Sequence, residues 1–271
     1  MKKILLLLDV LHSPAAILSS IVRLAKEDDS FIQVLFLHRA HFQADLAYPL
    51  SADIPMLEAN EKADHQLLED NLQLVRDAFQ VAGLPFRISD EETLLDELLD
   101  NTAFSDLILA DARMNLPDFL YAPLNISMKD LLTDAHCPLL LLRENSQPTE
   151  RVVLAYDGHY SSIYAIKQFS YLFPELRAVP TFLLEISSRE GKLDHQDYLK
   201  DWLPRHFENV VVEVLPGKAS EILPAFINRQ TGPTMVVMGA YGRTAVSRLF
   251  RQSLANAVIE KTASSLFITH E

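Results

Sequence analysis

The chain has 271 residues, of which 49% are hydrophobic and 23% charged, and this composition predicts a globular protein with room for two domains. The formal net charge of −13 arises in residues 1–144, which carry 11 Lys and Arg against 24 Asp and Glu, whereas residues 145–271 carry 13 of each. This charge argues against nucleic acid and anionic membranes as partners, because both are bound mainly through Lys and Arg. No apolar run reaches the roughly 20 residues of a membrane-spanning helix. The single cysteine, Cys137, excludes an internal disulfide, so we expect a cytoplasmic protein with a buried structural thiol.

Short apolar segments alternate with amphipathic segments along residues 1–144, which is typical of parallel strands connected by helices. The expected strands read KILLLLD, FIQVLFLH, LPFRIS, DLILAD and PLLLLR. The expected helices cover residues 14–28, 55–82, 91–101 and 125–135. In the second of these helices, one set of apolar residues recurs at helical spacing and predicts a buried stripe: Leu68, Leu72, Val75, Phe79 and Ala82.

Residues 145–271 repeat the same order of elements. The expected strands read RVVLAYD, VPTFLLEIS, NVVVEVLP, TMVVMGA and SLFITH, with helices over 161–173, 194–206, 219–229 and 247–262. The repeat predicts an α/β protein made of two tandem open parallel sheets of five strands, with helices on both faces. We expect the domains to be 1–144, which carries a long insertion over 41–83, and 145–271, with the polar linker ENSQPTE at their boundary.

Aligning the two repeats brings corresponding strand ends together. LLLLDVLHSPAAI matches VVLAYDGHYSSIYAI, so Asp9 corresponds to Asp157, and DLILADAR matches MVVMGAYG, so Arg113 corresponds to Gly242. Ligands of open α/β sheets bind beyond the carboxyl ends of the strands, which makes these residues candidates for a site. An aspartate after a strand also commonly caps the next helix, and we expect only this role for Asp9.

The segment MVVMGAYGRTAVSRLFRQSL has features of a phosphate site. Gly239 and Gly242 follow a strand, where glycine lets the backbone approach a ligand and free helix amides attract phosphate. Residues 222–259 contain four arginines and no Asp or Glu. The corresponding part of the first repeat has no glycine and three aspartates, so we expect it to be closed to phosphate. A glycine pair that serves only the turn remains the alternative.

The order of elements and the sequence MGAYGRTAVSRLFRQSLANAVIEKTASSLFIT resemble the universal stress protein family, here in a tandem form. The resemblance implies an adenine nucleotide alpha hydrolase-like fold with strand order 3-2-1-4-5. It also implies the nucleotide motif G-x2-G-x9-G-[S/T], in which this chain has Gln252 in place of the third glycine, followed by Ser253. The nucleotide-binding residues implied by the family are Ala155, Tyr156, Asp157, Ile186, Met238, Gly239, Gly242, Gln252, Ser253 and Leu254.

Two functions stay open because the Gln252 side chain either fills the phosphate position or donates its amide to an oxygen. The first is a non-enzymatic stress-response or regulatory protein that binds ATP or AMP weakly in the second domain. The second is a scaffold or small-ligand binding protein that has lost nucleotide binding. An enzyme of another nucleotide fold has little support, because G-x4-G-K-[S/T] is absent. Zinc has little support as well, since the histidines, including His38 and His41, form no H-x-x-x-H pattern.

Assembly can also be inferred from the resemblance. Dimers of the family often form through their last strands, which implies that the PLLLL and SLFIT strands pair and make an internal pseudo-dimer of the two domains. Such pairing would cover two apolar edges that otherwise invite association. A homodimer of the whole chain is a further expected partner arrangement.

Overall fold

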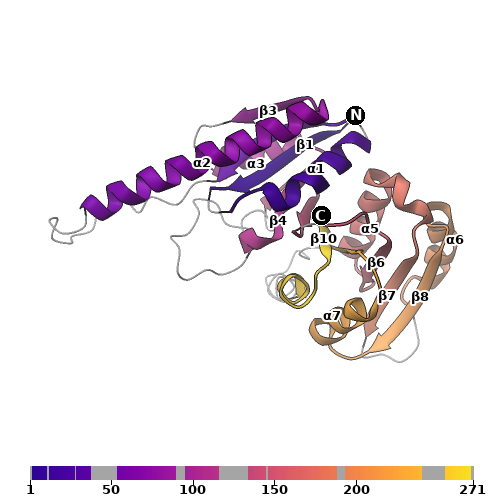
Figure 1. The fold of residues 1–271 in the computed structure, drawn as a ribbon. Helices are drawn as coiled ribbons and strands as arrows, with labels where there is room; N and C mark the ends of the chain where they lie inside the picture. The colour runs from indigo at the N-terminus through magenta and orange to yellow at the C-terminus, as the bar shows by residue number, and fades with distance from the viewer. Residues whose placement is uncertain are drawn as a thin grey trace. The chain divides into compact units, whose positions relative to one another are not determined.

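The structure is a computed structural model, which describes residues 2–10, 12–27, 29–37, 54–89, 95–115, 134–144, 146–187, 193–239 and 254–269. It divides into two compact units, Met1–Leu131 and Leu132–Glu271, and many of their elements are labelled in Figure 1. Each unit combines parallel strands with helices, as the alternation of apolar and amphipathic segments predicts. No helix among the described residues is long and apolar enough to cross a membrane.

The first unit is built on four described strands that all run parallel. They are β1 (Lys3–Asp9), β2 (Phe31–Leu37), β3 (Phe86–Ser89) and β4 (Leu107–Asp111), in the order β3-β2-β1-β4. The helices are α1 (Ala15–Glu27), α2 (Ile54–Ala82), α3 (Leu95–Ala103) and the short η1 (Ala112–Asn115). Strand β1 is almost continuously buried, because parallel strands are covered on both faces and therefore need apolar residues at every position.

The long helix α2 confirms the expected helix within the insertion. Its stripe of Leu68, Leu72, Val75 and Phe79 is buried, whereas Ala82 at the helix end is only half-buried. This stripe is a packing surface: α2 packs against α1, and Phe79 makes an edge-to-face contact with Phe86 of β3. The expected helix over 125–135 lies almost entirely outside the described residues.

The second unit has six described strands. They are β5 (Leu139–Leu142), β6 (Arg151–Tyr156), β7 (Thr181–Ser187), β8 (Val210–Pro216), β9 (Thr234–Gly239) and β10 (Ser265–Thr269). The helices are α5 (Tyr160–Leu172), η2 (Pro174–Ala178), α6 (Gln196–His206) and α7 (Ala219–Arg229), and residues 254–261 are also helical. The strand order β8-β7-β6-β9-β10 is the expected 3-2-1-4-5, and all these neighbours pair in parallel.

Strand β5 changes the expected division of strands. It closes the first repeat in the sequence, yet it lies in the second unit and pairs antiparallel with β10, from Leu266 opposite Leu141 to Ile268 opposite Leu139. The expected pairing of the PLLLL and SLFIT strands is therefore confirmed. The expectation of five strands in each sheet is corrected to four described strands in the first unit and six in the second.

Candidate functional site

The second unit holds a cavity of about 370 Å³ at the carboxyl ends of β6, β7 and β9. This is the edge at which open α/β sheets bind ligands, because crossovers leave the central strand in opposite directions there. Seven of the ten residues expected from the sequence line this one cavity: Ala155, Tyr156, Asp157, Ile186, Met238, Gly239 and Leu254. The other three, Gly242, Gln252 and Ser253, lie outside the described residues.

Asp157 supports the turn between β6 and α5. Its Oδ1 accepts a hydrogen bond from the backbone N–H of His159 at 3.1 Å, and the His159 ring nitrogen Nδ1 lies 3.5 Å from the same oxygen. The Asp157 side chain is 42% exposed. The carboxylate therefore holds the turn that precedes α5 and still faces the cavity.

Gly239 is required by close packing. A Cβ atom at this position would lie 2.5 Å from the carbonyl carbon of Ser161 and 2.9 Å from the backbone nitrogen of Ser162, both in α5. The residue has no positive φ, so the absence of a side chain, and not backbone freedom, is what the position needs. The glycine lets α5 approach β9, a packing role that was not among the two alternatives, phosphate binding or the turn, given from the sequence.

Tyr156, which lines the cavity, and Glu185 of β7 both bond to the segment Asp194–His195. The Tyr156 hydroxyl donates to the carbonyl oxygen of Asp194 at 3.0 Å and lies 3.1 Å from Nδ1 of His195. Burial, with the charges of Glu185, Asp194 and Asp157, raises the pKa of Tyr156 to about 12. Burial also raises the pKa of the Glu185 carboxyl, and the neighbouring carboxylates add to this shift although the carboxylate accepts a hydrogen bond from the Asp194 N–H.

Sequence reasoning missed the wall of the cavity formed by the turn from β8 to α7. Gly217 and Lys218 line the cavity there, and Gly217 has a φ of +135°, which favours glycine. Lys218 brings a cationic side chain to the wall, and its Nζ lies 3.6 Å from Oε1 of Glu221. The signal for this segment is the sequence LPGKAS, in which a glycine and a lysine follow a strand and precede a helix.

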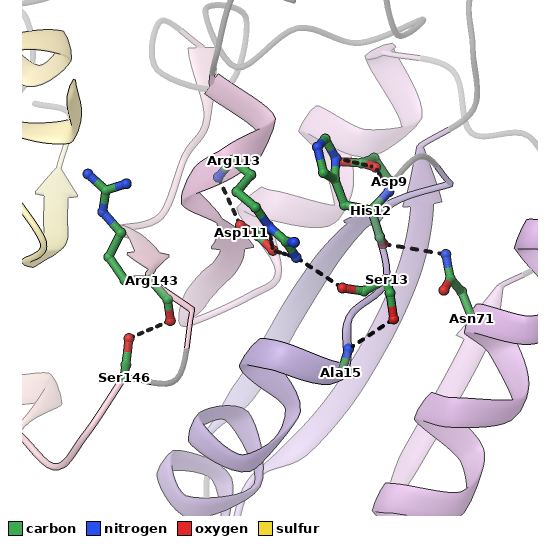
Figure 2. Close-up of polar contacts among 9 residues, drawn as sticks. All are labelled: Asp9, His12, Ser13, Ala15, Asn71, Asp111, Arg113, Arg143 and Ser146. Carbon is green, nitrogen blue, oxygen red and sulfur yellow. Dashed lines mark hydrogen bonds and ion pairs between the residues drawn. The ribbon is translucent and has the colours of Figure 1, made fainter.

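The corresponding strand ends of the first unit carry two internal ion pairs, drawn in Figure 2. Asp9 is buried at the end of β1, where it accepts from the backbone N–H of His12 at 2.7 Å and from the His12 ring at 2.8 Å. Its hydrogen bond is the main cause of the raised pKa of His12. Asp111, at the end of β4, is held by Arg113, whose Nε donates to it at 2.9 Å and whose Nη2 also donates to the Ser13 carbonyl oxygen at 2.9 Å. Asp9 is thus paired with a histidine and Asp111 with an arginine of the same unit.

Other expected features give no second site. Cys137 is buried, as expected for a structural thiol. Within the part of the chain that the structure describes, no three His, Cys, Asp or Glu side chains lie together as metal ligands would. His38 and His41 lie outside that part.

Comparisons with known proteins identify the fold. The chain is similar over 98% of its length to a universal stress protein from Archaeoglobus fulgidus, with a TM-score of 0.67, 15% identity and 96% of that chain covered. A Pseudomonas aeruginosa protein that is provisionally named a universal stress protein matches this chain with a TM-score of 0.56 at 12% identity. The match covers all of this chain and 93% of that protein. A functionally unknown protein from the same species matches with a TM-score of 0.54 at 13% identity, over all of this chain and 92% of its own.

No protein-family model matches the sequence, and no curated protein matches it. At these identities the similarity defines the fold and nothing finer. The chain has the universal stress protein fold. Its length is close to that of the Archaeoglobus fulgidus chain, because the match covers nearly all of both.

Proposed function

We propose that the second unit binds an adenine nucleotide, ATP or AMP, weakly in its strand-end cavity, and that the protein serves a regulatory role in a stress response. One observation carries the proposal: residues from three strands and one helix, each expected from the sequence to contact nucleotide, converge on one cavity of about 370 Å³. Ligand cavities in proteins commonly measure about 300–1,000 Å³. Ala155 and Met238 offer an apolar surface for a base, and Asp157 offers a carboxylate for a ribose hydroxyl.

The charges at the cavity favour weak binding. Asp157 lines it, and a carboxylate there repels the phosphates of a nucleotide. The Nζ of Lys218 lies 3.6 Å from Oε1 of Glu221, which reduces the charge available to a ligand.

The proposed role is binding and not catalysis. The Tyr156 hydroxyl lies 3.1 Å from Nδ1 of His195, but it donates its proton to the Asp194 carbonyl oxygen and not to the imidazole, so the pair is not arranged as an activated nucleophile and its base. Asp157 holds a backbone turn, and the Tyr156 hydroxyl, with its pKa raised to about 12, keeps its proton at neutral pH.

A scaffold or small-ligand protein without nucleotide affinity is the second candidate. Gly239 supports it, because packing against α5 fully accounts for the glycine and removes one reason to expect a phosphate there. The acidic surroundings of Tyr156 and Asp157 support it as well.

Calorimetry with ATP, ADP and AMP separates the two candidates. We expect saturable binding at millimolar nucleotide, weakened by Ala155→Leu, which fills the cavity with the residue type that the first repeat has at the matching position, Leu7. Ala178→Leu is the matched control, since Ala178 is exposed in η2 and does not line the cavity. Absence of binding in the native chain, together with its appearance in Gln252→Gly, would establish the scaffold candidate instead.

A further inference from the structure

A second cavity in the same unit lies between α5 and α6 and measures about 490 Å³. Its floor is apolar and formed by Ile163 and Ile166 of α5 and by Leu199 of α6, while Tyr198 and Trp202 of α6 supply aromatic walls. The cavity shares no lining residue with the strand-end cavity. It is therefore a separate site, and a ligand bound there does not depend on the proposed nucleotide binding.

Aromatic side chains remain accessible at this cavity. Tyr198 is 78% exposed, and the Trp202 ring is half-buried and stacks on His206 with ring centroids 4.0 Å apart. Burial and the nearby cations Arg177, Arg205 and Lys167 lower the pKa of His206, so the imidazole is neutral at neutral pH. The stack thus holds the indole in place without adding a positive charge. Tyr and Trp in such partly exposed positions are the side chains that proteins favour for ligand contacts.

The charged side chains that line the cavity are the carboxylates of Asp197 and Asp201, one turn apart on α6, and the ammonium group of Lys167 from α5. Asp201 accepts a hydrogen bond from Arg205 at 2.8 Å, in an ion pair whose two side chains are exposed to solvent. Carboxylates therefore outnumber cations among the lining residues, and Asp197 borders the same cavity as Tyr198 and Trp202. Aromatic faces and a carboxylate together are the usual surroundings of a bound organic cation.

We propose that the cavity between α5 and α6 binds a small aromatic cation, such as an arylalkylammonium. Its ring packs on the apolar floor and against Trp202, and its charge lies near Asp197 and the face of Tyr198. Burial of aromatic surface supplies most of the binding free energy. The attraction between the ligand's positive charge and the site gives the preference for a cation over a neutral or anionic molecule of the same shape.

Trp202 provides a direct measurement, because it is the single tryptophan of the chain. The full-length protein is titrated with benzyltrimethylammonium, benzyl alcohol and benzoate, which place a positive, a neutral and a negative group on the same ring. We expect a saturable change in tryptophan emission, with the cation binding about tenfold more tightly than the alcohol and benzoate weakest. Calorimetry gives the same order without relying on fluorescence.

Two variants test the assigned residues. Tyr198→Ala is expected to weaken the cation about three- to tenfold, and Asp197→Asn is expected to remove most of its advantage over the alcohol. Tyr160→Ala is the control for the tyrosine, since Tyr160 is 73% exposed on α5 and does not line the cavity. Glu221→Gln is the control for the carboxylate, since Glu221 lies in the first turn of α7 as Asp197 does in α6.

Thermal unfolding of each variant verifies that it is folded before binding is compared. The proposal is overturned by the absence of saturable binding of the cation to the native protein, by equal or tighter binding of the alcohol or benzoate, or by unchanged cation binding in both Tyr198→Ala and Asp197→Asn.

Discussion

Strand β1 ends in Asp9 and strand β6 is followed by Asp157, yet the two carboxylates have different surroundings. The Asp9 side chain is 1% exposed and bonds to the ring and backbone of His12, whereas the Asp157 side chain is 42% exposed and borders a cavity. His159, beside Asp157, is 74% exposed. Both carboxylates accept a hydrogen bond from a following backbone N–H, but Asp9 is enclosed in the fold of its unit whereas Asp157 borders a cavity. The difference between the two sites is therefore one of burial.

The fourth strands show the same contrast. The first repeat ends β4 with Asp111 and, two residues later, Arg113, which hold each other and tie the strand end to the Ser13 carbonyl oxygen. The second repeat has Ala240 and Gly242 at the matching positions. The sequence of the second repeat thus has no charged pair at these two positions, and substitutions at matching positions of the two repeats test what the pair contributes.

The largest expected effect is on Asp9. Asp9→Ala removes the acceptor of the His12 N–H and of the His12 ring, and we expect it to destabilise the first unit by about 2–3 kcal/mol, because the bonds are buried and charge-assisted. Asp157→Ala at the matching position of the second unit is expected to cost less than about 1 kcal/mol. Urea unfolding measures both, with hydrogen exchange at β1 and β6 to assign each loss to its unit. Equal losses in the two variants would remove the proposed difference between the strand ends.

Gly239 gives the second effect. Gly239→Ala pushes a methyl group into the backbone of Ser161, which cannot move without shifting α5, and we expect a loss of about 1–3 kcal/mol in unfolding free energy. The first repeat already carries a Cβ at this position in Ala110, so Ala110→Gly is the matched change and is expected to cost only about 0.5–1 kcal/mol. Denaturant unfolding of both proteins measures the comparison, and a neutral Gly239→Ala would contradict the packing role.

These contrasts define what the sequence could predict. Periodic apolar runs located the described strands within a residue or two, since each parallel strand needs several buried apolar residues in succession. The alignment of repeats also paired Asp9 with Asp157 correctly as strand-end residues. Periodicity could not predict which residues contact one another in the folded chain. Examples are the contact of Gly239 with the α5 backbone, the ion pair of Arg113 with Asp111 and the pairing of β5 with β10.

The cavity shows the same limit. Family resemblance supplied the residues at the ends of β6, β7 and β9, but it did not supply Gly217 and Lys218. These two residues reach the cavity because β8 pairs in parallel with β7, which brings the turn after β8 to the same edge of the sheet as Ile186. The sequence did not predict a role for His195 either. Its Nδ1 lies 3.1 Å from the hydroxyl of Tyr156, which is thirty-nine residues away in the sequence.

Tyr156 connects the two cavities of the second unit. It lines the strand-end cavity, and its hydroxyl lies 3.1 Å from His195, which lines the cavity between α5 and α6. Tyr156→Phe removes this hydroxyl, and we expect a loss of about 0.5–1.5 kcal/mol, since the Asp194 carbonyl oxygen loses a buried donor. The matching position of the first repeat is Leu8, which has no such hydroxyl. Thermal unfolding measures the loss, and an unchanged midpoint would show that the hydrogen bond contributes nothing to stability.

The smallest expected effects are on the pH dependence, and they have opposite signs in the two units. The pKa of His12 is raised above 6.5, chiefly by its hydrogen bond to Asp9 and further by the charges of Asp9 and Asp111, against burial and Arg113. Between the two pKa values the folded state therefore holds a proton on His12 that the unfolded state releases. The contribution of His12 to stability is complete below its pKa in the unfolded chain and is lost as the pH rises through its pKa in the folded chain. The pKa of His206 is lowered, chiefly by burial, so its contribution is complete above 6.5 and is lost as the pH falls.

His12→Gln and His206→Gln isolate these contributions. Unfolding free energies measured from about pH 5 to about pH 8.5 are expected to show that His12→Gln costs most at the acidic end and His206→Gln costs most at the alkaline end, each by less than about 1 kcal/mol. The opposite signs follow from the surroundings of the two rings: the hydrogen bond to Asp9 acts most strongly on His12, whereas burial acts most strongly on His206 and the charges of Arg177, Arg205 and Lys167 add to it. If both substitutions changed stability with the same sign of pH dependence, the carboxylate at the first unit's strand end would not be the partner that distinguishes the two units.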